Sequence, residues 1–228
     1  LANRGYFDKK ELLTLNQGGT NLPSHCDMNL TTGIDMTTGS LGQGFSCAVG
    51  VALGSKLEDD GATVYAIVGD GESQEGQVWE AAMFAASKGL GNLVGFTDYN
   101  KLQIDGTVAQ VNDIAPLADK WAAFGWNVID VADGNDVEQV SAAVKQAKAN
   151  RATGRPTMVI LNTLKGCGVK WIEEMGAGNH NTNVSEEQAK AAIAAAEGDY
   201  KSAAKNLDGY NEAVAQVMNN DLSAAKKA

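Results

Sequence analysis

Two polar clusters each follow a short apolar run, and their side chains are of the types that bind metal ions. Gly69-Asp70-Gly71 comes directly after the β-rich run Val64–Val68, and Asp98-Tyr99-Asn100 comes after the apolar run Leu93–Thr97. Carboxylate and amide oxygens are the ligands that hard cations such as Mg²⁺ prefer in proteins. The first question is therefore whether the fold brings Asp70 and Asn100 together.

The residues between the two clusters predict a helix that connects two strands. Apolar residues recur there at helical spacing, at Val78, Ala81, Ala82, Ala85 and Ala86. A helical crossover returns the chain in the same direction, so the two strands are expected to be parallel neighbours. Asp70 and Asn100 would then face one crevice beyond the carboxyl ends of the strands, the usual ligand position in open α/β sheets.

The chemistry of that crevice combines a phosphate-binding backbone with acidic side chains. Gly71 permits close approach of the backbone to a ligand, and helix N-termini attract anions. Asp70, Glu72 and Glu75 would repel a phosphate unless a cation lies between them. Mg²⁺ is usually held by one or two carboxylates together with substrate phosphates. The pattern predicts a magnesium site made by the Asp70 carboxylate, the Asn100 amide oxygen and a nearby main-chain carbonyl.

Other phosphate-binding motifs fit less well. Gln74 stands where G-x-G-x-x-G requires its third glycine, which argues against a nicotinamide-binding Rossmann domain. No G-x-x-x-x-G-K-[ST] occurs, which argues against a P-loop NTPase. An ordinary strand-to-helix turn with solvated acidic residues is also compatible with the local residues.

Composition limits the class of protein. The 228 residues suit one large α/β domain, or one domain with an appendage. The net charge of −10 argues against nonspecific nucleic-acid binding, and no apolar run has the length of a membrane span. Three widely separated cysteines without a CxxC pair fit a reducing cytoplasm and no zinc site.

The remaining elements are expected from caps, periodicity and Gly or Pro punctuation. Asp8 is a candidate cap for a first helix and Ser40 for a second, and Ser185 with Gln188 forms a capping-box pattern. Helices are expected within 7–16, 37–57, 116–124 and 134–150 and after Ser185, strands within 126–131 and 156–161, and loops over 21–36 and 166–184. The tail from Gly198 to Ala228 is predicted to be a peripheral helix with a frayed basic end.

Small residues recur every four positions in the second predicted helix. They are Gly42, Ser46, Gly50 and Gly54. Glycine costs about 0.8–1.0 kcal/mol against alanine inside a helix, so a packing reason is expected. The stripe could pack against the helix's own sheet or against another subunit.

The motif GDG, followed by Asn100 after an intervening helix and strand, resembles the thiamine diphosphate motif. The wider stretch resembles transketolases, particularly the N-terminal half that many prokaryotes encode separately. The similarity covers Arg4 to about Ser185, including TTGIDMTTGSLGQGFSCAVGVALGSKL before the motif and TLKGCGVKW after it. The resemblance implies an α/β fold with a mostly parallel sheet and helices on both faces. It implies a single diphosphate-binding domain over residues 1–228, truncated at its N-terminus, with a helical appendage from about residue 185.

The implied activity is transfer of a two-carbon ketol unit between ketose and aldose phosphates in the cytoplasmic pentose phosphate pathway. The implied cofactors are thiamine diphosphate and Mg²⁺, or another divalent cation such as Ca²⁺ or Mn²⁺. A complete transketolase also needs a pyrimidine-binding domain that supplies a catalytic glutamate. The implied partner is therefore a C-terminal transketolase half, either as a separate chain or as another part of a longer chain, in a dimer of such pairs, with no nucleic acid and no membrane.

The resemblance also assigns roles to residues of this sequence. For the metal they are Asp70, Asn100 and the Leu102 carbonyl. For the diphosphate they are Gly71 and Lys165, joined by His180, which also touches the incoming sugar. His25 and His180 would orient substrate and move protons. Gly39, Ser40 and Leu41 would face the aminopyrimidine, Ile104 would face the thiazolium, and Glu75 and Glu80 would be interface acids that link paired active sites.

One loop departs from the family pattern. The family carries G-H-P where this chain has Ser24-His25-Cys26, and split-type relatives usually have proline where Thr32 stands. Loss of proline frees φ and adds a backbone N–H donor. These changes are compatible with a looser loop or with a different sugar. A relative of 1-deoxyxylulose-5-phosphate synthase and a non-catalytic paralogue are further alternatives, and the presence of Asp70, Asn100, His25 and His180 argues against the paralogue.

Overall fold

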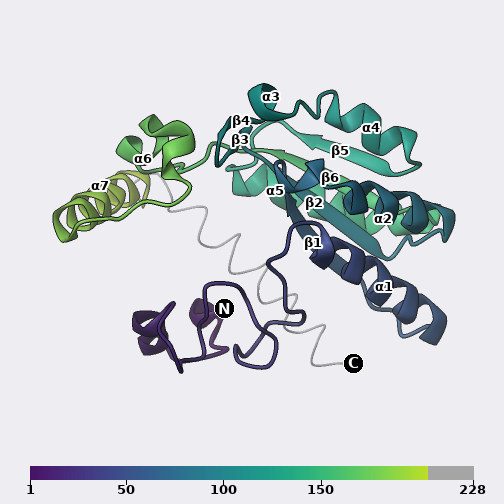
Figure 1. Cartoon of the computed structure of the whole chain (residues 1–228), viewed down its shortest axis with the longest axis horizontal. Helices are drawn as coiled ribbons and strands as arrows, with labels where there is room; N and C mark the ends of the chain where they lie inside the picture. Colours follow the sequence, from purple (N-terminus) through teal and green to yellow (C-terminus); the bar gives the residue numbers. More distant parts are fainter. Residues whose placement is uncertain (205–228) are drawn as a thin grey trace.

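The computed structural model describes residues 1–204 and is organised around one parallel sheet (Figure 1). The four strands are β1 (Val64–Gly69), β2 (Leu93–Tyr99), β5 (Asn127–Val131) and β6 (Thr157–Asn162). They lie in the order β1-β2-β6-β5, and every neighbouring pair is parallel. The α/β class and the parallel sheet expected from the sequence are confirmed.

The central strand–helix–strand unit forms as predicted. Helix α2 (Gly76–Ser87) connects β1 to β2 and buries Val78, Ala81, Ala82 and Ala85. Strand β2 is longer than predicted, because Asp98 and Tyr99, expected in a loop, pair with β6 at Leu161 and Asn162. A neighbour on each side of β2 satisfies its backbone groups up to that point.

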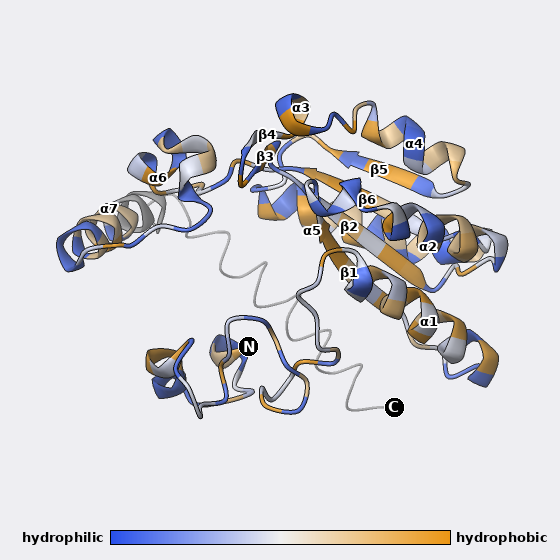
Figure 2. Cartoon of the chain, in the orientation of Figure 1, coloured by the Kyte–Doolittle hydropathy of each residue, from blue (hydrophilic) through white to orange (hydrophobic). Residues whose placement is uncertain are grey.

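Helices cover both faces of the sheet, as expected. Helices α1 (Gln43–Glu58), α2 and α4 (Leu117–Ala123) pack on one face, and α5 (Val137–Asn150) packs on the other. The hydrophobic colours of Figure 2 concentrate on the strands and on helical residues that face them. The apolar residues Val137, Val140, Ala143, Val144 and Ala147 recur at helical spacing in α5, which predicts that they share one face. Ala143 and Ala147 are buried, whereas Val137 is 69% exposed at the start of the helix.

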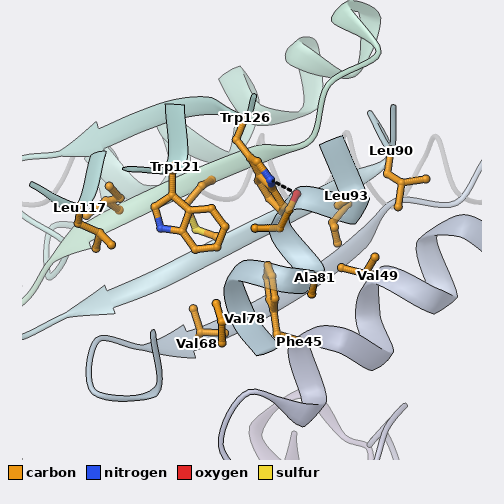
Figure 3. Close-up of a cluster of buried hydrophobic side chains, with 14 of the residues drawn as sticks. Phe45, Val49, Val68, Val78, Ala81, Leu90, Leu93, Leu117, Trp121 and Trp126 are labelled. Atoms are coloured by element: carbon orange, nitrogen blue, oxygen red, sulfur yellow. Dashed lines mark hydrogen bonds between the residues drawn. The ribbon is translucent and has the colours of Figure 1, made fainter. Parts of the chain in front are cut away.

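An aromatic cluster fills the core on the α1, α2 and α4 side (Figure 3). The ring of Phe45 lies 5.8 Å from that of Trp121 and 5.9 Å from that of Trp126. Nε1 of Trp126 donates to the Ala82 carbonyl at 2.9 Å, so its polar atom is satisfied. This cluster fixes α1 and α2 against the strands whose ends carry the predicted site.

Shorter elements surround this body. They are η1 (Ala2–Arg4), η2 (Lys9–Thr14), η3 (Glu72–Gln74), β3 (Leu102–Gln103), β4 (Gly106–Thr107), α3 (Val108–Val111), η4 (Arg151–Thr153), α6 (Lys170–Glu174), η5 (Gly176–Asn179) and α7 (Glu186–Ala204). Strands β3 and β4 form an antiparallel hairpin that the sequence did not predict. No helix within residues 1–204 combines the length and the apolar content needed to cross a bilayer.

The predicted cap of α1 is wrong, and one of the two packing alternatives for its small residues is excluded. Its N-cap is Gly42, with φ at +78°, and Ser40 contributes only its carbonyl, which accepts from the Gln43 N–H at 3.2 Å. The buried face of α1 carries Phe45, Val49 and Ala52. Gly50 and Gly54 are exposed, and a Cβ at either would meet nothing within 4 Å. The small-residue stripe therefore does not pack against the sheet of its own chain.

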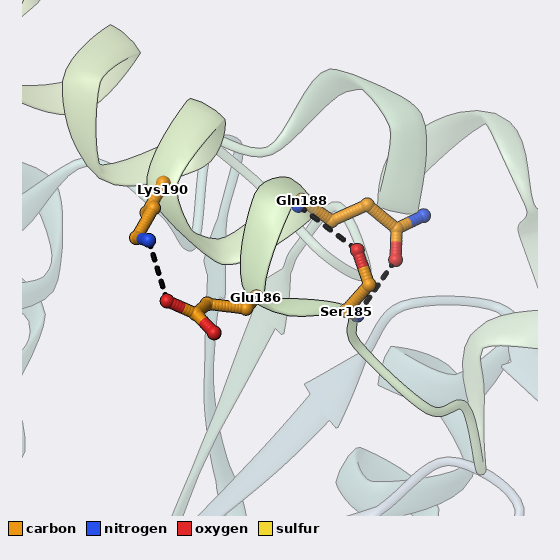
Figure 4. Close-up of polar contacts among 4 residues, drawn as sticks. All are labelled: Ser185, Glu186, Gln188 and Lys190. Carbon is orange, nitrogen blue, oxygen red and sulfur yellow. Dashed lines mark hydrogen bonds and ion pairs between the residues drawn. The ribbon is translucent and has the colours of Figure 1, made fainter.

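The two end regions follow their predictions in part. The first predicted helix is a 3₁₀ helix, η2, and Asp8 caps it by accepting from the Lys10 N–H at 2.9 Å. The stretch 166–184, predicted to be an irregular loop, contains α6 and η5. The capping box at α7 is confirmed: Ser185 N–H donates to Gln188 Oε1 at 2.9 Å, and Gln188 N–H donates to Ser185 Oγ at 3.2 Å (Figure 4). The predicted tail beyond residue 204 lies outside the described residues.

Candidate cofactor site

Asp70 and Asn100 lie at the tips of neighbouring strands. Asp70 directly follows β1 and Asn100 directly follows β2, and the register pairs Gly69 with Asp98. The Asp70 N–H donates to the Asp98 carbonyl at 3.2 Å, which continues the pairing by one step. The prediction that these side chains share one edge of the sheet is confirmed.

Asp70 is a buried carboxylate held by main-chain donors. The residue is 2% exposed, and its Oδ1 accepts from the Gly71 N–H at 2.7 Å. Its Oδ2 accepts from the N–H of Lys101, which has φ at +67°. Burial raises the pKa of Asp70 above its ordinary value and Asp98 adds to the rise, whereas the two backbone hydrogen bonds and the charge of Lys165 oppose it.

Asn100 belongs to a polar network across two strand ends. Its Oδ1 accepts from the Leu102 N–H at 3.0 Å, and its Nδ2 donates to Oδ2 of Asp98 at 3.3 Å. Oδ1 of Asp98 accepts from the hydroxyl of Thr163, which follows β6. Local sequence patterns do not single out Asp98 or Thr163 as site residues, because their proximity depends on the pairing of β2 with β6.

Lys165 lies at the same edge as Asn100. A hollow of about 450 Å³ at the strand ends is lined by polar side chains that include Asp98, Asn100, Asn135, Thr163 and Lys165. Gly71 faces the β3–β4 hairpin, since a Cβ there would lie 3.3 Å from Cβ of Gln103. The edge therefore brings together an acid, an amide, a lysine and a glycine.

The donor set at this edge fits a divalent cation. Asp70 offers a buried carboxylate, and the two ion pairs of the described residues, Lys170–Glu174 and Lys190–Glu186, both lie elsewhere on the surface. Within residues 1–204 no group of three His, Cys, Asp or Glu side chains is placed to hold a metal ion. One carboxylate with an amide oxygen and main-chain carbonyls, completed by phosphate and water, remains an ordinary Mg²⁺ arrangement.

The predicted ring-facing residues form a second group around His25. The side chain of His25 packs on Gly39, where a Cβ would lie 2.6 Å from Cδ2 of the imidazole. His25, Gly39 and Ser40 line a hollow of about 400 Å³ together with Cys47. Leu41 is 56% exposed next to this group.

The other predicted residues are exposed and are not joined to the strand tips. Ile104, at the turn of the β3–β4 hairpin, is 67% exposed, and His180 is an exposed residue at the end of η5. Glu75 is the N-cap of α2 and Glu80 is an exposed residue on that helix. Among residues 1–204, no hydrogen bond connects His180 or Ile104 with Asp70 or Asn100.

A comparison with protein families gives a match over nearly the whole described chain. Residues 4–203 match the family described as "Transketolase, thiamine diphosphate binding domain". A 6-deoxy-6-sulfo-D-fructose transketolase subunit of Clostridium sp. (strain MSTE9) is 55% identical over 194 residues, which is 85% of this chain and 69% of that protein. An apulose-4-phosphate transketolase subunit of Actinobacillus succinogenes is 37% identical over 187 residues, which is 82% of this chain and 66% of that protein.

Solved structures agree with this match. A transketolase from Campylobacter jejuni superposes with a TM-score of 0.72 at 28% identity, over 80% of this chain and 29% of that one. This chain thus corresponds to a part of the length of its relatives. The family match, the subunit relatives and the shared fold lead to one conclusion: the chain belongs to the transketolase family, as a thiamine diphosphate-binding domain.

Proposed function

We propose that this chain is the diphosphate-binding subunit of a thiamine diphosphate-dependent transketolase that transfers two-carbon ketol units. The observation that carries the proposal is the buried Asp70 carboxylate beside Asn100 at two adjacent strand tips. A diphosphate with its cation needs an acid and a basic donor at one edge, and Lys165, which lines one hollow with Asn100, supplies the basic group.

Each residue has a separate role in this proposal. Asp70, Asn100 and the Leu102 carbonyl hold Mg²⁺, or Ca²⁺ or Mn²⁺ in its place, and Gly71 and Lys165 bind the diphosphate. When bound, thiamine diphosphate supplies the electron sink that the cleavage of a carbon–carbon bond requires. The burial of Asp70 would keep water away from its carboxylate, and the charge of Lys165 would offset remaining negative charge.

The residues outside the strand tips act on the ring and the sugar. Gly39, Ser40 and Leu41 contact the aminopyrimidine, and Ile104 contacts the thiazolium. His25 and His180 orient the sugar and transfer protons at its hydroxyl groups. Glu75 and Glu80 link the sites of paired subunits.

The family reaction and the name of one relative suggest different donor sugars. The general family reaction uses ketose and aldose phosphates, whereas a relative with 55% identity is named for 6-deoxy-6-sulfo-D-fructose. The Ser24-His25-Cys26 loop lies next to the ring-facing group and differs from the family triplet. We propose that this chain accepts a ketose with an anionic end, and that sulfonated and phosphorylated donors should be compared directly.

The proposal requires a partner. Two relatives are named as subunits, which supports a partner for this chain. We propose a partner chain with the pyrimidine domain and its catalytic glutamate, in a dimer of such pairs. A non-catalytic paralogue is the alternative, and the presence of Asp70, Asn100, His25 and His180 argues against it.

The test begins with calorimetric titration of thiamine diphosphate into the chain, with Mg²⁺ and with EDTA. Binding with Mg²⁺ that is lost in EDTA supports the site, and absence of binding in both conditions rejects it. Ketol transfer is then measured with the product of the adjacent open reading frame as partner. Cofactor binding without transfer in that complex would favour the non-catalytic paralogue, and full transfer by this chain alone would reject the split arrangement.

A further inference from the structure

One carboxylate connects the two groups of the candidate site. Oε1 of Glu72 accepts from the Gly42 N–H at 2.8 Å, and Oε2 accepts from the Gly69 N–H at 3.0 Å. Gly42 begins α1 directly after the ring-facing segment 39–41, and Gly69 ends β1 directly before Asp70. Segments far apart in the sequence are therefore held by a single half-buried side chain.

The local sequence explains why α1 needs this acceptor. In a capping box, a Glu or Gln at the third helical position accepts from the N–H of the N-cap residue. Phe45 occupies that position in α1 and is buried in the core, at 2% exposed. Glu72 supplies the missing acceptor from the loop after β1.

The second hydrogen bond has a similar origin. Among the strands of residues 1–204, β1 pairs with β2 alone and lies at an edge of the sheet. An edge strand presents N–H groups that no other strand satisfies. The carboxylate of Glu72 accepts from the Gly69 N–H with one oxygen and from the Gly42 N–H with the other. The bridge therefore uses both acceptor oxygens of the side chain.

Further contacts fix the geometry of this bridge. A Cβ at Gly42 would lie 2.9 Å from Cγ of Gln77 and 3.2 Å from Cβ of Glu75. The start of α1 therefore packs closely against the start of α2. On the other side, the Ser73 N–H donates to the Asp70 carbonyl at 3.1 Å, within the short turn that carries Glu72. Glu72 therefore has little freedom to move independently of either group.

We propose that Glu72 is a positioning residue that fixes the ring-facing segment 39–41 relative to the diphosphate site. This inference rests on the proposed function, because segment 39–41 faces the cofactor ring if thiamine diphosphate binds as proposed. Loss of one acceptor oxygen should release the start of α1 while Asp70, Asn100 and Lys165 keep their places. Thiamine diphosphate should then lose the part of its binding affinity that its ring contributes, whereas the affinity for pyrophosphate, which has no ring, should not change.

The experiment compares two probes in the full chain with Mg²⁺. Thiamine diphosphate and inorganic pyrophosphate are titrated calorimetrically into the wild-type chain and into Glu72→Gln. This substitution keeps the size of the side chain and replaces one of its two acceptor oxygens with a donor group. We expect affinity for thiamine diphosphate to fall by at least about fivefold and affinity for pyrophosphate to change by less than about twofold. Amide exchange at Gly42 should become faster. Glu138→Gln, an exposed carboxylate on α5, is the matched control and should change neither affinity.

The remaining outcomes overturn one proposal or the other. Equal weakening of both probes would mean that Glu72 supports only the metal loop, and unchanged binding of both would mean that it positions nothing. Equal affinity of the wild-type chain for the two probes would overturn the ring-facing role of segment 39–41 alone. Failure of the wild-type chain to bind pyrophosphate would overturn the proposed function, and that result needs no substitution to be seen.

A second variant guards against loss of the fold. Far-ultraviolet circular dichroism checks that Glu72→Gln is folded. Glu72→Asp retains the charge but is one methylene shorter, so it cannot span both N–H groups. It should show the same selective loss for thiamine diphosphate, and wild-type affinity for both probes in Glu72→Asp would overturn the inference.

Discussion

At the residue scale, the feature with the greatest consequence is a buried acid without a counter-ion in direct contact. Asp70 is 2% exposed and its carboxylate is satisfied by two main-chain N–H groups rather than by a cationic side chain. An ionised carboxylate in such a place is costly to the fold. The arrangement is explained if Asp70 serves a bound cation, which offsets that cost only in the liganded state.

The first prediction concerns Asp70→Asn. A ligand at about 100 times its dissociation constant should stabilise the wild-type chain by about 2.7 kcal/mol. Thermal unfolding with Mg²⁺ and pyrophosphate should show this gain in the wild-type chain, and Asp70→Asn should show almost none. Asp119→Asn, on the exposed side of α4, should behave like the wild-type chain. A full gain in Asp70→Asn would mean that the cation is bound elsewhere.

The raised pKa of Asp70 gives a prediction about pH. Since burial raises the pKa of this carboxyl, the folded chain without cation binds the proton more tightly than the unfolded chain does. Stability without cation should therefore fall as the pH rises from the ordinary aspartate value through the raised pKa. Affinity for the cation should change in the opposite direction, because the proton and the cation compete for one carboxylate.

Two measurements check these signs. The difference in melting temperature between the wild-type chain and Asp70→Asn, without cation, should become less favourable to the wild type as the pH rises through that window. The affinity of the wild-type chain for Mg²⁺ with pyrophosphate should rise over the same window. A difference in melting temperature that favours the wild type at higher pH would show that the hydrogen bonds outweigh burial at Asp70.

At the element scale, the positions of the strand tips depend on the turns that pack against them. Gly134, between β5 and α5, has no room for a side chain: a Cβ would lie 2.7 Å from Cγ2 of Thr163 and 3.0 Å from the Leu161 carbonyl carbon. Backbone cannot yield as a flexible side chain does. The added methyl group of Gly134→Ala should therefore displace the end of β6. Thr163 and Lys165 follow that strand and should move with it.

The expected cost of Gly134→Ala is about 1–3 kcal/mol, typical of overpacking in a close-packed site. Pyrophosphate binding should weaken as well, because Lys165 and Thr163 move with the end of β6. Gly54→Ala is the matched control, since a Cβ there meets nothing within 4 Å, and it should stabilise α1 by about 0.8–1.0 kcal/mol. Chemical denaturation measures the free energy of unfolding of both variants. A Gly134→Ala chain as stable as the wild type would contradict the close packing of this turn.

The elements also show which features a sequence can predict. The run Val64–Val68 and the helical spacing in α2 are local patterns, so they predicted the parallel unit and the shared edge of Asp70 and Asn100. The continuation of β2 through Asp98 depends on pairing with Leu161, more than sixty positions later. The cap of α1 was assigned to Ser40 because its true acceptor, Glu72, comes from another loop. Such features depend on contacts that no local window contains.

At the scale of the whole molecule, two surfaces are left uncovered by the elements of residues 1–204. On the α5 side of the sheet, Tyr65 and Ile67 of edge strand β1 are 45% and 74% exposed, respectively. On α1, Gly50 and Gly54 face outward with no neighbour within 4 Å. Relatives named as subunits, together with these surfaces, favour an assembled state in which α1 meets another chain at close range.

The last prediction tests that assembly through Gly50→Leu. Because nothing lies within 4 Å of a Cβ at Gly50, and leucine is a better helix former than glycine, the chain alone should fold at least as stably as the wild type. If another chain packs closely on the stripe, the larger side chain should weaken association by about tenfold or more, the effect of about 1.4 kcal/mol. Sedimentation equilibrium measures that association with and without the partner chain. Ala142→Leu, an exposed small residue on α5, is the matched control and should leave association unchanged. Wild-type association in Gly50→Leu would show that this face of α1 stays in solvent, and the repeated glycines would then have no packing explanation.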